Sequence, residues 1–131
     1  MQLAPFLAAP TLVQLHAAAG LSAFGLGLWQ LAMPKGTWPH RRLGWAWVGL
    51  MLGLALSSFG ITGRWGAGHL SWIHGLSFLV LLLLPLAVLH VRRGRVAGHR
   101  RLMLALFFGA LVVTGAFTLM PGRLMARIVF S

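Results

Sequence analysis

Four long apolar stretches alternate with short polar segments along the 131-residue chain. The stretches cover residues 11–33, 43–61, 70–90 and 102–120. Each is close to the roughly 20 residues that cross the ~30 Å hydrocarbon core of a bilayer. The segments between them carry turn residues, and Thr37 is expected to cap the N-terminus of the second helix, with Pro39 in its first turn. The pattern predicts an all-α membrane protein whose single domain, residues 1–131, is a bundle of four transmembrane helices.

Composition supports a membrane protein and excludes several classes of chemistry. Apolar residues make up 59% of the chain, its mean hydropathy is +0.87, and it contains no Asp, Glu or Cys. Catalysis by a side-chain carboxylate, an EF-hand, a disulfide and a thiolate metal site are therefore excluded. The eleven Lys and Arg residues lie mainly at the ends of the apolar stretches. Membrane topology explains this distribution better than nucleic-acid binding does.

The distribution of basic residues predicts the orientation. One side of the membrane receives the first and third loops with Lys35, Arg41, Arg42, Arg92, Arg93, Arg95, Arg100 and Arg101, and the opposite side receives Arg64, Arg123 and Arg127. The richer side is expected to be cytoplasmic, so that both termini lie outside. We therefore expect a multi-pass protein of the bacterial inner membrane. Residues 123–131 alternate basic and apolar positions, which predicts a short interfacial helix.

A repeated motif indicates that the chain consists of two similar halves. His40-Arg41-Arg42-Leu43 recurs as His99-Arg100-Arg101-Leu102 at an offset of 59 residues, and His16 and His74 are 58 residues apart. Helix one therefore corresponds to helix three and helix two to helix four, which predicts two parallel two-helix repeats about an axis along the membrane normal. The alternative explanation is that cytoplasmic helix ends simply collect basic residues, although this does not account for His16 and His74.

The repeat predicts two pairs of histidines on helices that lie diagonally across the bundle. His16 and His74 would lie near the outer face, and His40 and His99 near the inner face. Two axial imidazoles per site are what a bis-histidine haem b requires, and bundle interiors are where such cofactors bind. The sequence thus predicts two haems b, with these four histidines as metal ligands.

Other residues refine this hypothesis. Arg41, Arg42, Arg100 and Arg101 are candidates to hold haem propionates beside the inner pair. The competing interpretation of His40 and His99 is that they are solvated residues of first helical turns, whereas intramembrane His16 and His74 are more strongly indicative of function. His90 is interpreted as interfacial and His69 as a loop residue. A copper site is disfavoured because the six methionines form no paired motif.

Three segments of the sequence resemble a known family. The segment LAMPKGTWPHRRLGWAWVGLML at 31–52, the segment GHRRLM at 98–103 and Pro121-Gly122-Arg123 resemble a bacterial predicted-membrane-protein family of unknown function, domain-of-unknown-function family 2306. The likeness covers about His16 to the C-terminus. The plan of this family is similar to the two-haem cytochrome b superfamily, which implies the ligand pairs His16 with His74 and His40 with His99.

Three functions follow from these observations. The first is a di-haem cytochrome b that transfers electrons across the bilayer, with quinone or another small molecule as redox partner. The second is a haem-free membrane protein that binds a lipid, an ion or a partner helix through its basic cytoplasmic face. The third is an enzyme on the haem scaffold that acts on quinone or a small oxygen species. Membrane lipids are expected partners, a homodimer is compatible with each function, and nucleic acid is not expected.

Overall fold

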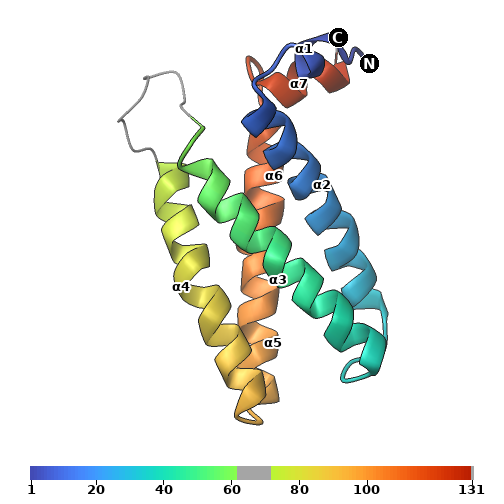
Figure 1. Ribbon diagram of the computed structural model, residues 1–131, viewed down its shortest axis with the longest axis vertical. Coiled ribbons are helices and arrows are strands. Elements are labelled where there is room, and N and C mark those ends of the chain that lie inside the picture. Colours follow the sequence, from blue (N-terminus) through green and yellow to red (C-terminus); the bar gives the residue numbers. More distant parts are fainter. Residues whose placement is uncertain (62–71, 131) are drawn as a thin grey trace.

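The computed structural model describes residues 1–61 and 72–130, and these parts contain helices and turns but no strand. The helices are α1 (Ala4–Leu7), α2 (Thr11–Ala32), α3 (Trp38–Ser58), α4 (Trp72–Arg92) and α7 (Leu124–Phe130). Between α4 and α7, the segments α5 (Val96–Leu104), η1 (Ala105–Val112) and α6 (Val113–Thr118) form one continuous helix. The expectation of an all-helical protein is therefore confirmed (Figure 1).

The turns lie where the sequence predicts them. Thr37 is the N-cap of α3, and its hydroxyl accepts a hydrogen bond from the backbone N–H of His40. Gly36, Gly94 and Gly122 have φ values of +77°, +75° and +86°, a region that favours glycine because it has no Cβ. The predicted loop at 60–68, with Arg64, lies mostly outside the described residues, as does His69.

Two helices begin earlier than the apolar stretches predict. α3 begins at Trp38 and α5 at Val96, so that both His-Arg-Arg motifs are helical. Arginine is a good helix former, and its long side chain carries the charge away from the backbone. The start of an apolar stretch therefore lies within the helix and does not mark the residue at which the helix begins.

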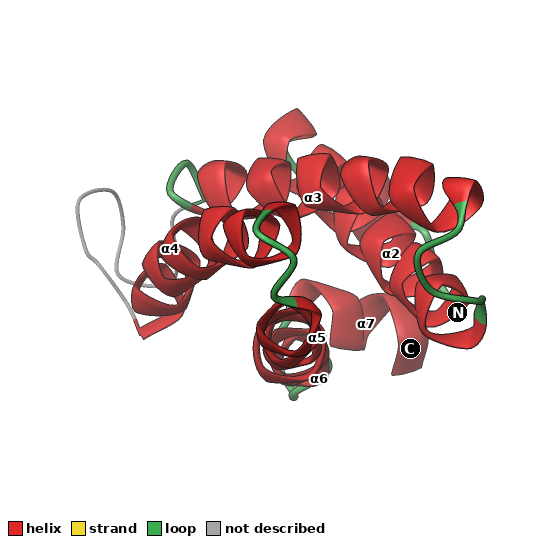
Figure 2. Ribbon diagram, turned by 90° about the horizontal axis from the view of Figure 1, so that it is seen from below, coloured by secondary structure: helices red, strands yellow, loops and turns green. Residues whose placement is uncertain are grey.

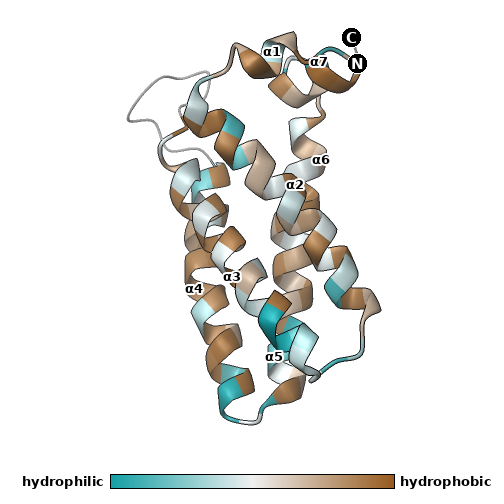
Figure 3. Cartoon of the chain, turned by 45° about the vertical axis from the view of Figure 1, so that its right-hand side comes forward, coloured by the Kyte–Doolittle hydropathy of each residue, from teal (hydrophilic) through white to brown (hydrophobic). Residues whose placement is uncertain are grey.

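Three helices are long and apolar enough to cross a membrane: α2, α4 and the continuous helix Val96–Thr118. α3 is of similar length but is not one of these three, since His40, Arg41 and Arg42 occupy its first turns. Large apolar side chains are widely exposed on the bundle; Leu21 is 70% exposed and Leu82 is 69% exposed. Such surfaces are suited to lipid and not to water. Figure 3 shows most of the hydrophilic ribbon gathered at the lower end of the long helices.

The long helices form a ring. α3 packs against both α2 and α4, α5 packs against α4, and η1 contacts both α2 and α4. Figure 2, which looks along the bundle from below, shows α3 on the side opposite to α5 and α6. α1 and α7 pack together across one end, where the Gln2 N–H donates to the Ile128 carbonyl at 3.0 Å. We call this end the α7 end, and the opposite end, with Lys35 and the two His-Arg-Arg motifs, the basic end.

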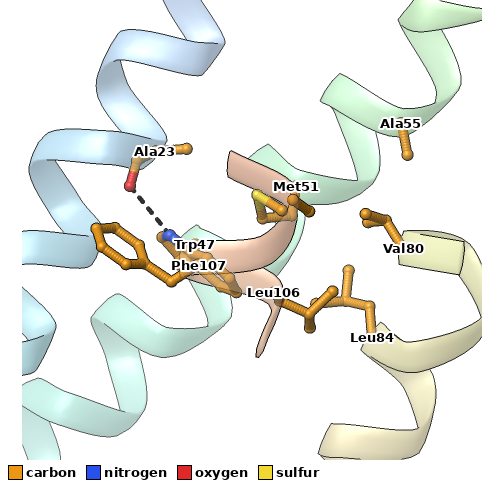
Figure 4. Close-up of a cluster of buried hydrophobic side chains, with 9 residues drawn as sticks. Ala23, Trp47, Met51, Ala55, Val80, Leu84, Leu106 and Phe107 are labelled. Atoms are coloured by element: carbon orange, nitrogen blue, oxygen red, sulfur yellow. Dashed lines mark hydrogen bonds between the residues drawn. The ribbon is translucent and has the colours of Figure 1, made fainter. Parts of the chain in front are cut away.

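A core of nine buried residues fills the middle of the bundle (Figure 4). The indole Nε1–H of Trp47 donates to the carbonyl of Ala23 at 3.0 Å and so joins α3 to α2. Gly27 allows the close approach of Phe107, because a Cβ at this position would lie 2.4 Å from the phenyl ring. The full core comprises Ala23, Trp47, Met51, Ala55, Val80, Leu84, Leu106, Phe107 and Ala110.

The fourth long helix contains an eight-residue π-helical segment, η1, that no sequence signal predicts. Its buried residues are Leu106, Phe107 and Ala110, and the hydroxyl of Thr114 donates to the Ala110 carbonyl. π-helical hydrogen bonds are rare and are usually confined to single turns, often at functional sites. Here the wider turn lies at the part of the helix that contributes to the central core.

Candidate functional site

The four predicted histidines lie on the faces of their helices that also carry the core residues. On α2, His16 precedes the fully buried Ala23 by seven residues, which is nearly two helical turns. On α4, His74 is itself buried, with 8% of its surface exposed, and Ser77, about one turn further along the helix, is buried as well. Both helices therefore direct a histidine toward the interior near the α7 end, on one side of the central core.

The second pair shows the same relation at the basic end. His40 precedes buried Trp47 by seven residues on α3, and His99 precedes buried Leu106 by seven residues along α5 and η1. Both histidines are half-buried. The sequence-predicted ligands are thus divided into two pairs by a layer of apolar side chains.

At the α7 end, hydrogen bonds assign the proton on His16. Its Nδ1 lies 2.6 Å from the Oγ of Ser57, and this Oγ lies 3.1 Å from the carbonyl of Leu54. A carbonyl only accepts, so the single hydroxyl proton of Ser57 goes to Leu54, and Ser57 accepts from the Nδ1–H of His16. The Nε2 of neutral His16 therefore carries the lone pair.

His74 lies beside the same end of α3. Its ring centroid is 5.6 Å from that of Phe59, the residue that follows the last turn of α3. One turn further along α4, the hydroxyl of Ser77 is 2.6 Å from that of Ser58, which ties α4 to α3. His16 and His74 are therefore both held next to residues 57–59, from the two helices that flank α3.

At the basic end, the Nδ1 of His99 lies 2.9 Å from the carbonyl of Ala87 on α4. Since the carbonyl can only accept, Nδ1 carries the proton, and the lone pair of neutral His99 is on Nε2. A histidine that ligates a metal commonly donates its other N–H in this way, which fixes the ring and its tautomer. His16 and His99 share this arrangement, one at each end of the bundle.

His40 completes the inner pair on the first turn of α3, before the apolar part of that helix. Burial, followed by the positive charge of Lys35 and by repulsion from the protonated form of His99, lowers the pKa of His40 below its ordinary value of 6.5. His40 is therefore mainly neutral at pH 7, which is the form that ligates metal. Within residues 1–61 and 72–130, its buried Nδ1 has no hydrogen-bond partner.

The four candidate arginines adjoin this pair in the sequence. Two of them, Arg41 and Arg42, follow His40 in the chain, and the other two, Arg100 and Arg101, follow His99. All four are exposed. The guanidinium of Arg42 also lies 4.7 Å from the centre of the Trp38 ring. These side chains are accessible to an anionic group at the basic end.

The structure shows two features at this end that the sequence analysis did not identify. Gln30 of α2 donates from Nε2 to the His40 carbonyl at 3.1 Å, while its Oε1 is buried without a partner in the described part of the chain. His90, expected to be interfacial, is half-buried in the last turn of α4. Its ring lies against Gly98, since a Cβ added to Gly98 would be only 2.6 Å from the Nδ1 of His90. The spacing between His90 and Gly98 gives no sequence signal, because the α4–α5 turn decides the contact.

The four histidines supply imidazole donors at two separate places along the bundle. Among the described residues, no group of three His, Cys, Asp or Glu side chains is arranged to hold a metal ion. A planar macrocycle supplies four of its own ligands and requires only two imidazoles from the protein, and each end offers two on helix faces that carry buried residues. Two apolar grooves lie on the outside of the bundle, and neither is lined by a histidine. Comparisons of the chain with protein-family models, curated proteins and solved structures found no match.

Proposed function

We propose that this protein is a di-haem membrane cytochrome b, with one haem between His16 and His74 and the other between His40 and His99. The single observation that supports this proposal most is the position of all four histidines on helix faces that carry core residues, two at each end of that core. The proposal includes membership of the family of unknown function named above and a location in the bacterial inner membrane.

The chain's own residues would hold and tune the cofactor. The Ser57 hydroxyl and the Ala87 carbonyl accept from the Nδ1–H groups of His16 and His99, which orients each ring and makes its Nε2 more basic. Exposed Arg41 and Arg100 are suited to bind propionate carboxylates next to the inner pair. When bound, haem b supplies reversible one-electron chemistry, with quinone or another small molecule as the proposed redox partner.

The proposal also requires a particular topology. We propose that α3 spans the membrane together with the three more apolar helices, with both termini outside, and that α2–α3 and α4–α6 are parallel repeats. The ring order of the helices supports this, because it sets α2 across from α4. The low hydropathy of α3 is due mainly to His40, Arg41 and Arg42 in its first two turns, which would lie at the cytoplasmic surface.

Reporter fusions test the topology. Alkaline phosphatase, which is active only in the periplasm, is expected to be inactive when fused at Pro34 or Gly94 and active when fused after Phe130. The physical reason is the excess of Lys and Arg at the basic end, which favours the cytoplasmic side. Activity at Pro34 together with inactivity after Phe130 would show the inverted orientation.

A second candidate is a haem-free membrane protein that binds a lipid, an ion or a partner helix through its basic end. The exposure of Arg41, Arg42, Arg100 and Arg101 favours it. A third candidate is an enzyme on the haem scaffold. An assay for steady-state turnover of quinone or superoxide would distinguish it from the cytochrome.

An absorption spectrum of the purified protein tests the main proposal. Protein expressed with ample haem is expected to carry two haems b per chain, with sharp bands of low-spin b-type haem after reduction by dithionite. Two imidazole ligands to each iron would give the low-spin state. A colourless protein would refute the proposal and leave the haem-free alternative.

A further inference from the structure

A groove between α3 and α4 near the basic end has the form of a lipid site. It has a volume of about 340 Å³ and is lined on α3 by Trp45, Val48 and Leu52, and on α4 by Leu84, Pro85, Val88, Leu89 and Arg92. Every lining residue except Arg92 is apolar. Trp45 and Leu89 are 57% and 42% exposed, so the groove is open on the outer face of the bundle.

The groove has one charged end. Arg92 is in the last turn of α4. Pro85 precedes it by seven residues and so lies about 10 Å away along the helix axis, toward the middle of α4. The groove therefore extends from a cation at the membrane surface toward the apolar middle of the bundle. A phospholipid has the same order of groups, with a charged phosphate at the surface and an acyl chain that extends inward.

No acidic side chain of this chain competes with an external anion for Arg92. The sequence contains no Asp or Glu, so no carboxylate side chain is able to pair with this guanidinium. A guanidinium binds phosphate with two parallel hydrogen bonds, and basic groups at the membrane surface favour lipids with net negative charge. Trp45 adds an amphipathic ring of the kind that is common at the level of lipid headgroups.

We propose that this groove binds an anionic phospholipid, with one acyl chain between α3 and α4 and the headgroup phosphate on Arg92. The inference does not depend on haem, because no histidine lines the groove. The bound lipid would contact both α3 and α4, and α3 is the least apolar of the long helices.

Native mass spectrometry of the full chain in detergent tests this proposal. Phosphatidylglycerol and phosphatidylcholine with identical acyl chains are titrated separately onto the protein. We expect the first lipid to bind roughly fivefold more tightly at one site, as a single basic group near a membrane surface predicts. Arg92→Gln is expected to abolish this preference. Arg93→Gln removes the same charge from the adjacent exposed position, which does not line the groove, and is expected to change the preference by less than about twofold.

Two further measurements examine the apolar half of the site. Leu89→Ala shortens one wall and is expected to weaken both lipids by a similar factor. Inorganic phosphate at millimolar concentration is not expected to displace phosphatidylglycerol, because it lacks the acyl chain. Equal effects of Arg92→Gln and Arg93→Gln, equal affinity for the two lipids, or displacement by phosphate would overturn the proposal. The exposed position of Arg92 leaves the core intact, and an unchanged thermal midpoint of Arg92→Gln verifies this.

Discussion

Replacing His74 with alanine is expected to reduce the haem content from two per chain to one. The remaining haem should keep the reduced spectrum of the inner pair, since His40 and His99 lie on the other side of the central core. His16→Ala is expected to produce the same spectrum as His74→Ala, because on the proposal each replacement would remove one of the two imidazoles that hold the same haem. His40→Ala and His99→Ala are expected to remove the other haem. The measurement is the reduced-minus-oxidised spectrum together with a haem-to-protein ratio.

His90 provides the matched control for this series. It is a half-buried histidine near the same end of α4 as Ala87, but its ring packs against α5 at Gly98. His90→Ala is therefore expected to retain both haems. If His16→Ala and His74→Ala left different haems in place, the assignment of the pairs would be wrong. A loss of both haems in His90→Ala with unchanged content in His99→Ala would contradict the inner site.

Gly27→Ala is expected to destabilise the protein, whereas Gly25→Ala is not. A Cβ at residue 27 would lie 2.4 Å from the Phe107 ring and 3.1 Å from Nε1 of Trp47, in the centre of the core. Overpacking of this kind typically costs about 1–3 kcal/mol. A Cβ at residue 25 meets no atom within 4 Å, so this variant is expected to gain the roughly 0.5–1 kcal/mol by which Ala exceeds Gly within a helix.

The two glycine variants differ only by position on one helix, so their comparison separates packing from helix propensity. Thermal unfolding in detergent, monitored by circular dichroism, measures the difference. Equal midpoints for Gly27→Ala and Gly25→Ala would mean that α2 and η1 do not approach as closely as the structure indicates. A decrease with Gly25→Ala alone would indicate that this exposed face of α2 packs against a partner.

The positions of the candidate ligands illustrate how far the sequence predicts the site. His16 and His74 were singled out by their repeat spacing and their depth in apolar stretches, and both lie on faces with core residues. The role of Ser57 was not predictable, because its contact with His16 spans 41 residues of sequence. The close approach of Gly98 to His90 was not predictable either, because the path of the turn between α4 and α5 decides it. Contacts between helices depend on rotation and crossing of the helices, which local patterns do not specify.

The sequence by itself determined the elements: long apolar helices, a cap at Thr37 and turns at Gly36 and Gly94. It did so because helix length, capping and positive φ are local properties of the chain. Only the tertiary structure decided the ring order of the helices, the π-helical segment η1 and the hydrogen bonds that assign the protons of His16 and His99. Close packing, as between Gly27 and Phe107, and hydrogen bonds between neighbouring helices both depend on the positions of several helices at once.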